Sequence, residues 1–360
     1  MGLYVQNPNP NGFVRFGRKL YNDKLQFKKG YNFVLWFIFA GALFGFALAR
    51  LQYLDIDGKY KAGAAPGEYF YMQRSFQKAG MLLHLASVLP ASLLAPWQFI
   101  PAIRYRALLF HRINGYLLIL LLLSGNVGGL MIARYAFGGD LATQSFAGFL
   151  TVSTVTSVSL AFYNIKRLQI DQHRAWMIRT WVYMGVVVTI RIITILSALI
   201  ISRFPGYFLA MPCRKLESME VDTSVFPACQ ANPDGYTAIE ANFNIPEIQN
   251  IGAALNISFG MAGWIGIVIH FVGAEIYLRL TPAEDERLRR ISYERQLERG
   301  FSHPGSAGLT ADRLGDAHPW APPADLVSEK QSPSLAQTLN ETIASSTEDV
   351  QKPATAPGWR

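Results

Sequence analysis

Six apolar segments, each long enough to cross a lipid bilayer, constrain the fold of this chain more than any other feature. A helix needs about 20 apolar residues to span a hydrocarbon core about 30 Å thick. Of the 360 residues, 51% are hydrophobic and only 16% are charged, which is too apolar for an ordinary soluble domain. The expected spans are residues 32–53, 79–99, 113–133, 141–163, 177–201 and 251–280. Since lipid leaves backbone polar groups unsatisfied, the sequence predicts an all-α, polytopic transmembrane helical bundle.

Basic residues cluster at four places that fall on one side of this six-span arrangement. The clusters precede the first span, lie between the second and third spans and between the fourth and fifth, and follow the sixth. The positive-inside rule assigns that side to the cytosol. We therefore expect both termini to be cytosolic and the first span to be an uncleaved anchor. The endoplasmic reticulum is the default membrane, with the plasma membrane as the alternative.

The chain divides into four parts by composition. Residues 1–31 form a basic cytosolic segment, and residues 32–280 form the transmembrane bundle with a long extracytoplasmic loop at 203–250. Residues 281–299 have acidic residues first and basic residues later, which suits the dipole of a short charged helix. Residues 300–360 are rich in Ser, Pro, Ala and Thr, and we expect this cytosolic tail to be disordered.

Both cysteines of the chain, Cys213 and Cys229, fall in the extracytoplasmic loop. Disulfides persist outside the cytosol, and closing a loop of this size stabilises a fold by about 3 kcal/mol. We expect a disulfide between them. The alternative is two free thiols near the membrane surface.

Arg191 lies in the middle of the fifth apolar segment, where a charge costs roughly 2.5–3.5 kcal/mol on insertion scales. Such a residue normally faces a bundle interior and has a partner. Candidate partners are the hydroxyls of Thr151, Thr154 and Ser157, the carboxylate of Glu275, or an anionic ligand. Arg191 is therefore either a structural hydrogen-bonding hub or a contact for a ligand or substrate.

A His-Arg pair opens two of the predicted helices at their cytosolic ends. His111 and Arg112 open one; His173 and Arg174, followed by Arg179, open the other. One interpretation is anchoring at headgroup depth, where these side chains extend toward water. The other is that the helices converge, so that both histidines face one site and the arginines bind anionic groups. Neutral imidazole is an axial ligand of haem iron, and arginines suit haem propionates, so haem b is the candidate cofactor.

Two further histidines lie within apolar segments. His270, on a face with Gly260, Gly263 and Ala274, is expected to be buried against a neighbouring helix and could replace one haem ligand. His84 lies in the outer half of its segment, without a histidine partner at that level. This weakens a two-haem arrangement, and a buried histidine bonded to a hydroxyl is the alternative for His84.

The chain resembles a known family at two motifs, HRINGY (His111–Tyr116) and QHRAWMIRTW (Gln172–Trp181). Arg191 lies further along the segment of the second motif, and His84 lies in an earlier segment. The family is one of predicted multi-pass membrane proteins of bacteria and fungi, catalogued as domain of unknown function 2306. The resemblance covers roughly residues 79–202. It implies a helical bundle in which four residues line a common interior: His84, His111, His173 and Arg191. It also implies a link to secondary-metabolite pathways for fungal members.

Three functions remain open from the sequence. The first is a membrane-embedded enzyme or accessory factor acting on a hydrophobic small molecule, in which histidines move protons and Arg191 stabilises an oxyanion. The second is a b-type haem protein that transfers electrons, with His111 and His173 as the first ligand pair. The third is a non-catalytic transporter or scaffold. No nucleotide-binding glycine loop or zinc-type cysteine spacing is present, and we expect lipid but no nucleic acid as a partner.

Overall fold

The computed structural model describes residues 11–204 and 206–323, which fall into two compact units. The first unit comprises Met1–Ala161 and Arg174–Thr281, and the second comprises Phe162–His173 and Pro282–Arg360. The turn between the fourth and fifth spans thus belongs to one unit with the charged C-terminal helix, and the four-part division by composition stays a prediction. Each unit is described by itself.

Six helical segments of the described chain are long and apolar enough to cross a membrane, which confirms the predicted multi-pass helical fold. They comprise residues 30–54, 75–98, 108–133, 141–166, 170–201 and 248–279. The corresponding helices are α2 (Gly30–Arg50, continued by the 3-10 turn η2, Leu51–Leu54), α5 (Ser75–Gln98), α7 (Leu108–Ala133), α8 (Leu141–Lys166), α9 (Ile170–Met184) with α10 (Val186–Ile201), and α13 (Ile248–Arg279). The side of the membrane that each end faces stays a prediction of the positive-inside rule.

Short elements connect the spans. Before and between the first spans lie α1 (Gly12–Arg18), η1 (Lys19–Lys24), η3 (Ile56–Tyr60), α3 (Lys61–Gly63), α4 (Tyr69–Met72), α6 (Pro101–Arg106) and η4 (Ala136–Gly139). The long loop contains β1 (Phe208–Pro212), α11 (Cys213–Glu217), η5 (Thr223–Val225), α12 (Pro227–Ala231) and β2 (Tyr236–Glu240). The charged helix α14 (Pro282–Glu298) follows the last span, as expected from its sequence.

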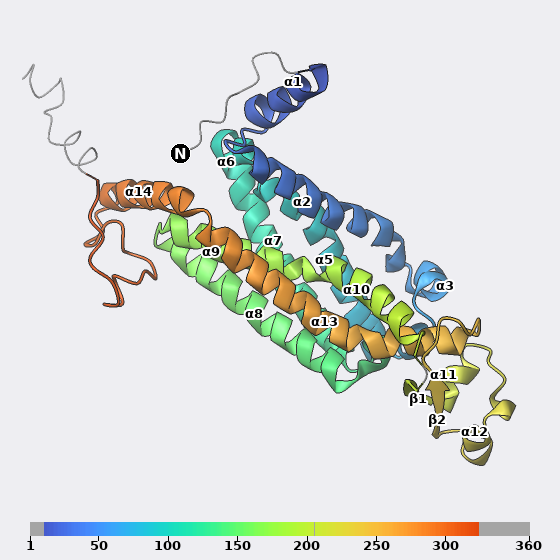
Figure 1. Cartoon of the computed structure of the whole chain (residues 1–360). Helices are drawn as coiled ribbons and strands as arrows, with labels where there is room; N and C mark the ends of the chain where they lie inside the picture. The colour runs from blue at the N-terminus through green and yellow to red at the C-terminus, as the bar shows by residue number, and fades with distance from the viewer. Residues whose placement is uncertain (1–10, 205, 324–360) are drawn as a thin grey trace, which may run out of the picture. The chain divides into compact units, whose positions relative to one another are not determined.

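Glycines allow the helices of the first unit to approach closely (Figure 1). A Cβ at Gly128 of α7 would lie 2.5 Å from the backbone nitrogen of His84 and 2.7 Å from the carbonyl of Gly80, both on α5. A Cβ at Gly260 of α13 would lie 2.7 Å from the backbone nitrogen of Thr143 on α8. The small-residue face predicted for the sixth span is therefore a packing face, as small residues commonly are between membrane helices.

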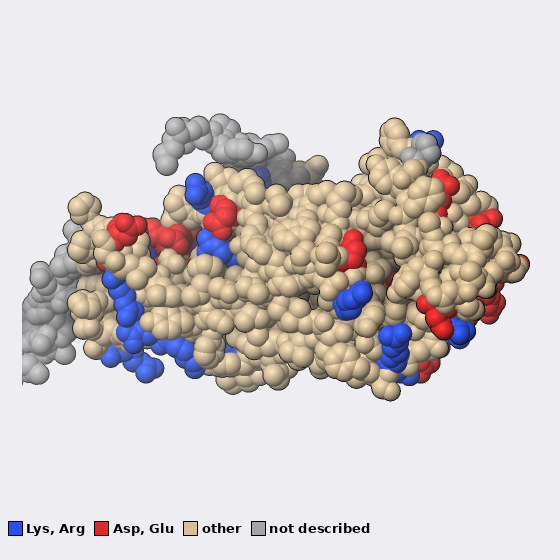
Figure 2. All heavy atoms as spheres, turned by 90° about the horizontal axis from the view of Figure 1, so that it is seen from below, with Lys and Arg blue, Asp and Glu red and all other residues tan. Residues whose placement is uncertain are grey.

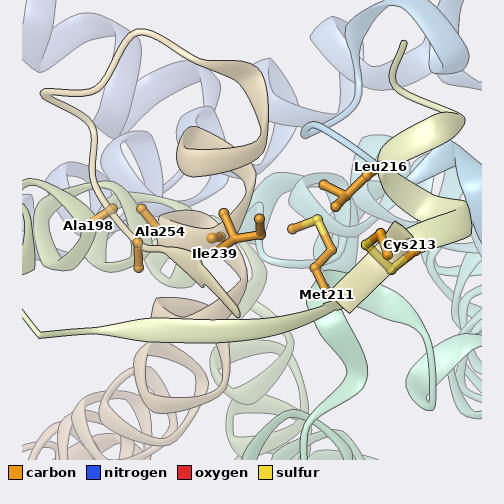
Figure 3. Packing of buried hydrophobic residues seen from close by; sticks show 9 residues of the cluster. Ala198, Met211, Cys213, Leu216, Ile239 and Ala254 are labelled. Carbon is orange, nitrogen blue, oxygen red and sulfur yellow. A yellow bond between two sulfur atoms is a disulfide. The ribbon is translucent and has the colours of Figure 1, made fainter. Parts of the chain in front are cut away.

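The long loop folds into a small two-stranded sheet with its own hydrophobic core. Strands β1 and β2 pair antiparallel, with Phe208 opposite Glu240. Cys213 and Cys229 form the expected disulfide. Met211, Leu216 and Ile239 pack against the disulfide and against residues at the ends of α10 and α13 (Figure 3). This packing fixes the start of α11 to the ends of two spans. In the part of the chain described, the two strands are the one departure from an all-α fold.

Charged side chains avoid the part of the surface that the membrane is expected to cover. One face of the molecule shows a broad uncharged band across the helices, with Lys, Arg, Asp and Glu gathered beyond it where β1, β2, α11 and α12 lie (Figure 2). Many large apolar side chains on the spans are exposed, as expected of helices in contact with lipid.

In the second unit, residues 301–323 are held by hydrogen bonds, so the disorder expected from residue 300 onward is wrong for this stretch. The buried Gln169 donates to the carbonyl of Gly305 at 2.9 Å, and Asn164 accepts from the backbone of Leu309 at 2.9 Å. Gln296 of α14 accepts from the backbone of Gly305. Buried amides thus supply partners for a polar, turn-rich segment, which composition alone does not reveal. Residues 324–360 lie outside the described part of the chain.

Candidate functional site

Arg191 of α10 lies against two stacked aromatic rings. Its guanidinium carbon is 4.6 Å from the ring centroid of Phe137 in η4 and 5.2 Å from that of Phe259 in α13. The two rings are stacked at 4.0 Å. Cation–π contacts contribute about 0.5–2 kcal/mol but occupy none of the five N–H donors of a guanidinium. Among residues 11–204 and 206–323, no acceptor hydrogen-bonds to these donors.

None of the four residues expected to hydrogen-bond Arg191 does so in the described structure: Thr151, Thr154, Ser157 and Glu275. Thr154 accepts instead from Asn126 at 3.1 Å. Glu275 accepts from Arg179 at 2.6 and 3.0 Å, in a bidentate pair. The expectation of a hydroxyl or Glu275 partner is therefore wrong for the described structure, in which Thr154 and Glu275 are engaged by other side chains.

Glu68, which lies outside the spans and just before α4, is a carboxylate whose charge acts on Arg191. Glu68 is only 2% exposed. Its Oε2 accepts from the backbone N–H of Phe137 at 2.7 Å, while its Oε1 lies 3.9 Å from Nζ of Lys215 and has no hydrogen-bond partner in the described structure. Burial raises the pKa of Glu68; the charge of Lys215, the Phe137 N–H and the charge of Arg191 oppose that rise.

The turn that presents Phe137 has an unfavourable backbone conformation. Phe137 has φ 48° and Gly138 has φ 79°, both in the left-handed region. A non-glycine residue held there costs of order 1–3 kcal/mol, and such residues are concentrated at functional sites. The conformation points the Phe137 N–H at Glu68 and places the ring beside Arg191, so one residue links the two charged groups.

Lys215 approaches Glu68 from the disulfide-bonded loop. It lies in α11, two residues after Cys213, and its side chain is only 2% exposed. Burial lowers the pKa of Lys215, and the charge of Glu68 opposes this effect. Gly67, with φ 77°, allows the approach, because a Cβ there would lie 2.3 Å from the lysine side chain. The packed loop thus holds a lysine at the end of the bundle.

Arg50, at the end of α2, is a third cation of this region. Its Nη1 donates to the hydroxyl of Tyr53 at 2.8 Å, and its charge acts on Arg191, as do Glu68 and Tyr60. We call Arg50, Glu68, Arg191 and Lys215 the outer charged cluster, after the end of the bundle that carries the loop 203–250. Sequence reasoning found only Arg191, because the other three read as ordinary charges of loops and helix ends.

His84 lies near the outer charged cluster. Its Nδ1 is 2.8 Å from the carbonyl oxygen of Gly125 on α7, and the Arg191 charge acts on its ring. A backbone carbonyl rather than the expected hydroxyl is thus its partner. His111 lies in the first turn of α7, fourteen residues before Gly125, which corresponds to about 21 Å along a helix axis. The common interior implied for His84, His111, His173 and Arg191 therefore stays a prediction; within the first unit, the charge of Arg191 acts on His84.

His270 is fully engaged at a break in the fifth span. The break lies at Gly185, between α9 and α10. There, Nδ1 of His270 is 2.5 Å from the carbonyl oxygen of Val182, and Nε2 is 2.8 Å from the hydroxyl of Thr189. We assign the proton to Nδ1, since a carbonyl can only accept. With both ring nitrogens in use, His270 does not fit the role of a haem ligand and instead supports the helix break.

The arginines predicted to bind anionic groups lie at the other end of the spans. Arg174 donates to Thr281 at 3.2 Å and lies 5.7 Å from the ring of Tyr277. Arg179 pairs with Glu275 and covers Trp176 at 4.6 Å. Arg112 is exposed at the start of α7. These contacts suit anchoring at the membrane interface. His173 belongs to the second unit, so its pairing with His111 stays a prediction.

Residues 81–211 match the sequence model of a family described as "Predicted membrane protein (DUF2306)". The resemblance noted from the sequence motifs is confirmed. Over a longer stretch the chain is similar to "Ava biosynthesis cluster protein G" of Aspergillus versicolor, with 25% identity over 322 residues. The match covers 74% of this chain and 94% of that relative. No solved structure matches the chain.

Proposed function

We propose that this integral membrane protein binds a hydrophobic small molecule at Arg191, and acts on it as an enzyme or accessory factor in secondary-metabolite biosynthesis. The observation that carries the proposal is a half-buried guanidinium in a membrane span, flanked by Phe137 and Phe259, with no hydrogen-bond acceptor in the described structure. A ligand oxygen would supply the missing acceptor, and the two rings would contact its apolar part.

The energetics of Arg191 favour a ligand role over a purely structural one. A cation in a membrane helix costs roughly 2.5–3.5 kcal/mol, and its contacts with the two rings recover at most part of this. A charge-assisted hydrogen bond to a ligand contributes about 1.5–3 kcal/mol more. Proteins keep a destabilising group of this kind where the group is needed for function.

Asn256 supports the same location. This residue of α13 is only 2% exposed, and neither its Nδ2 nor its Oδ1 has a hydrogen-bond partner in the described structure. It lies against Gly138, next to Phe137. A buried amide without partners costs about 1–3 kcal/mol, so a second polar group at this end of the bundle is also open to a ligand.

The pathway assignment rests on the relative. The name of that relative describes it as a biosynthesis cluster protein, and the match extends over 94% of its length. An integral membrane protein suits intermediates that partition into the bilayer. In this proposal, Arg191 holds a ligand oxygen and His84 is the nearest histidine able to take part in proton transfer, while His111 and His173 stay candidates for catalysis.

The b-type haem alternative is less well supported by the geometry. It requires two imidazole nitrogens that face one iron. Both nitrogens of His270 are engaged, and one nitrogen of His84 is engaged. The remaining pair, His111 and His173, belongs to two different units, and its role as a ligand pair stays a prediction.

Complementation tests the proposal. The coding gene is deleted in the source organism, and organic extracts are compared by mass spectrometry after return of the wild type, Arg191→Leu or Arg203→Leu. Arg203 is a matched control, an exposed arginine just beyond the same helix. We expect the deletion to abolish a lipophilic product, and the wild type and Arg203→Leu to restore it. Arg191→Leu should fail at equal protein level. Unchanged extracts after deletion would overturn the proposal.

A further inference from the structure

The outer charged cluster carries an excess of positive charge in every protonation state. Arg50 and Arg191 keep their protons, because guanidinium groups stay charged in proteins. Glu68 is the single carboxylate of the cluster and contributes at most one negative charge. Lys215 contributes nothing or one further positive charge. The net charge of the four groups is therefore at least +1, from two positive charges and one negative charge.

Two acidic groups of the same connecting segment, Asp55 and Asp57, are exposed and engaged elsewhere. The carboxylate of Asp55 accepts from the backbone N–H groups of Gly58 and Lys59, at 3.1 and 3.2 Å. Asp57 pairs with Lys78 at 2.5 Å and accepts from Tyr69.

The neighbouring tyrosines supply no negative charge either. Burial raises the pKa of Tyr60 and of Tyr71, so both phenols stay neutral. The excess positive charge of the four residues is thus not balanced by Asp55, Asp57, Tyr60 or Tyr71.

We propose that the ligand of this site is a lipophilic anion, a carboxylate or an enolate on an apolar body, whose negative head binds the outer charged cluster at Arg191. The proposal rests on the proposed function and specifies the class of ligand. An anion removes the uncompensated charge in a region of low dielectric, where the attraction is strong. Its oxygens also supply acceptors for the guanidinium, and carboxylates fit that group in a bidentate geometry.

The surroundings of Arg191 suit the apolar body of such a ligand. Phe137 and Phe259 lie on the guanidinium, and they belong to a hydrophobic cluster that also contains Phe146, Val186 and Ile190. One side of Arg191 is thus lined by apolar side chains, while Glu68 and Arg50 interact with it electrostatically. An amphiphile with an anionic head matches this arrangement better than a neutral hydrocarbon or a soluble anion does.

Two photoreactive probes test the charge requirement. One is a fatty acid that carries a diazirine and a terminal alkyne; the other is the corresponding fatty alcohol. The full-length protein in phosphatidylcholine nanodiscs is irradiated with each probe, and labelling is read after attachment of a fluorophore. We expect the acid to label the wild type roughly tenfold more strongly than the alcohol, which corresponds to about 1.4 kcal/mol. Arg191→Leu should remove this preference, and Arg203→Leu should retain it.

The variant Glu68→Gln gives a test of opposite sign. At a pH above the raised pKa of Glu68, it removes the negative charge while its amide oxygen can still accept from Phe137, so we expect stronger labelling by the acid and no change with the alcohol. Glu220→Gln, at an exposed position of the loop 203–250, is the matched control. Because this variant gains labelling, a general folding defect cannot mimic the expected result.

The outcomes separate this inference from the proposed function. Equal labelling by acid and alcohol, unaffected by Glu68→Gln, would overturn the anion inference and leave a neutral hydrophobic site. No specific labelling by either probe, above that of a protein-free nanodisc scaffold, would overturn both. Competition by phosphatidic acid would assign the anion to a lipid phosphate, and its failure to compete would assign it to a free carboxylate amphiphile; both support a lipophilic anion.

Discussion

The outer charged cluster and the polar contacts of His270 and Arg179 lie in the same helical unit but differ in how completely they are satisfied. His270 uses both ring nitrogens, and Arg179 has a bidentate carboxylate partner. Arg191 and one oxygen of Glu68 lack hydrogen-bond partners in the described structure. Buried polar groups that serve the fold are normally satisfied. The difference supports the proposal that the outer charged cluster is open to a ligand, whereas His270 and Arg179 hold the bundle together.

Removing the disulfide should have the largest effect on stability and should act on the outer region alone. The bridge closes a sequence separation of 16 residues, which corresponds to about 3 kcal/mol in the chain-entropy model. In a Cys213→Ser/Cys229→Ser variant, α11 should loosen and the buried Lys215 should react with an amine reagent. Mass spectrometry of the labelled lysine is the measurement. Protection of Lys215 equal to that in the wild type would show that packing alone holds it.

Replacing His270 by leucine should destabilise the bundle by about 2 kcal/mol, because two hydrogen bonds are lost and the groups at Val182 and Thr189 stay buried. Thermal unfolding in nanodiscs measures this effect. If His270 is a structural residue, product formation per folded molecule should not change. Loss of product at unchanged stability would instead move His270 into the functional site.

Arg179→Lys should have a smaller effect, about 1 kcal/mol, since a lysine keeps the ion pair with Glu275 but loses one of the two hydrogen bonds. We expect activity to stay close to that of the wild type and to be impaired far less than in Arg191→Leu. Complementation with both variants, at matched expression, makes the comparison. Equal activity of the two would remove the distinction between the regions.

The pH dependence of stability offers the finest test of the outer region. Burial raises the pKa of Glu68 above its usual 4.5, so the native protein takes up a proton that the unfolded chain does not as the pH falls toward 4.5. Stability should therefore rise on acidification in this window, and the rise should shrink in Glu68→Gln. Lys215 acts at higher pH, below its usual 10.5, where its lowered pKa reduces stability as the pH falls. Melting curves at about pH 5.5 and about pH 7.5 avoid most of the contribution of Lys215 to the pH dependence.

The sequence predicted the spans and the disulfide, but only part of the site. Hydrophobic runs and the location of both cysteines follow directly from the chemistry of bilayers and redox compartments. Arg191 was visible because a charge in an apolar run is exceptional. Glu68 and Lys215 were not, since each lies among ordinary loop residues and only tertiary packing buries them. His270 looked like a candidate ligand until its two hydrogen-bond partners were known.

The stability of Arg191→Leu, measured together with its response to ligand, tests the central claim most directly. Wild type and variant are melted in phosphatidylcholine nanodiscs, with and without the photoreactive fatty acid. If Arg191 is retained for a ligand, the ligand-free variant should be as stable as the wild type or more stable, and only the wild type should gain stability from the acid. A ligand-free variant clearly less stable than the wild type, with no gain from the acid in either protein, would show that Arg191 serves the fold.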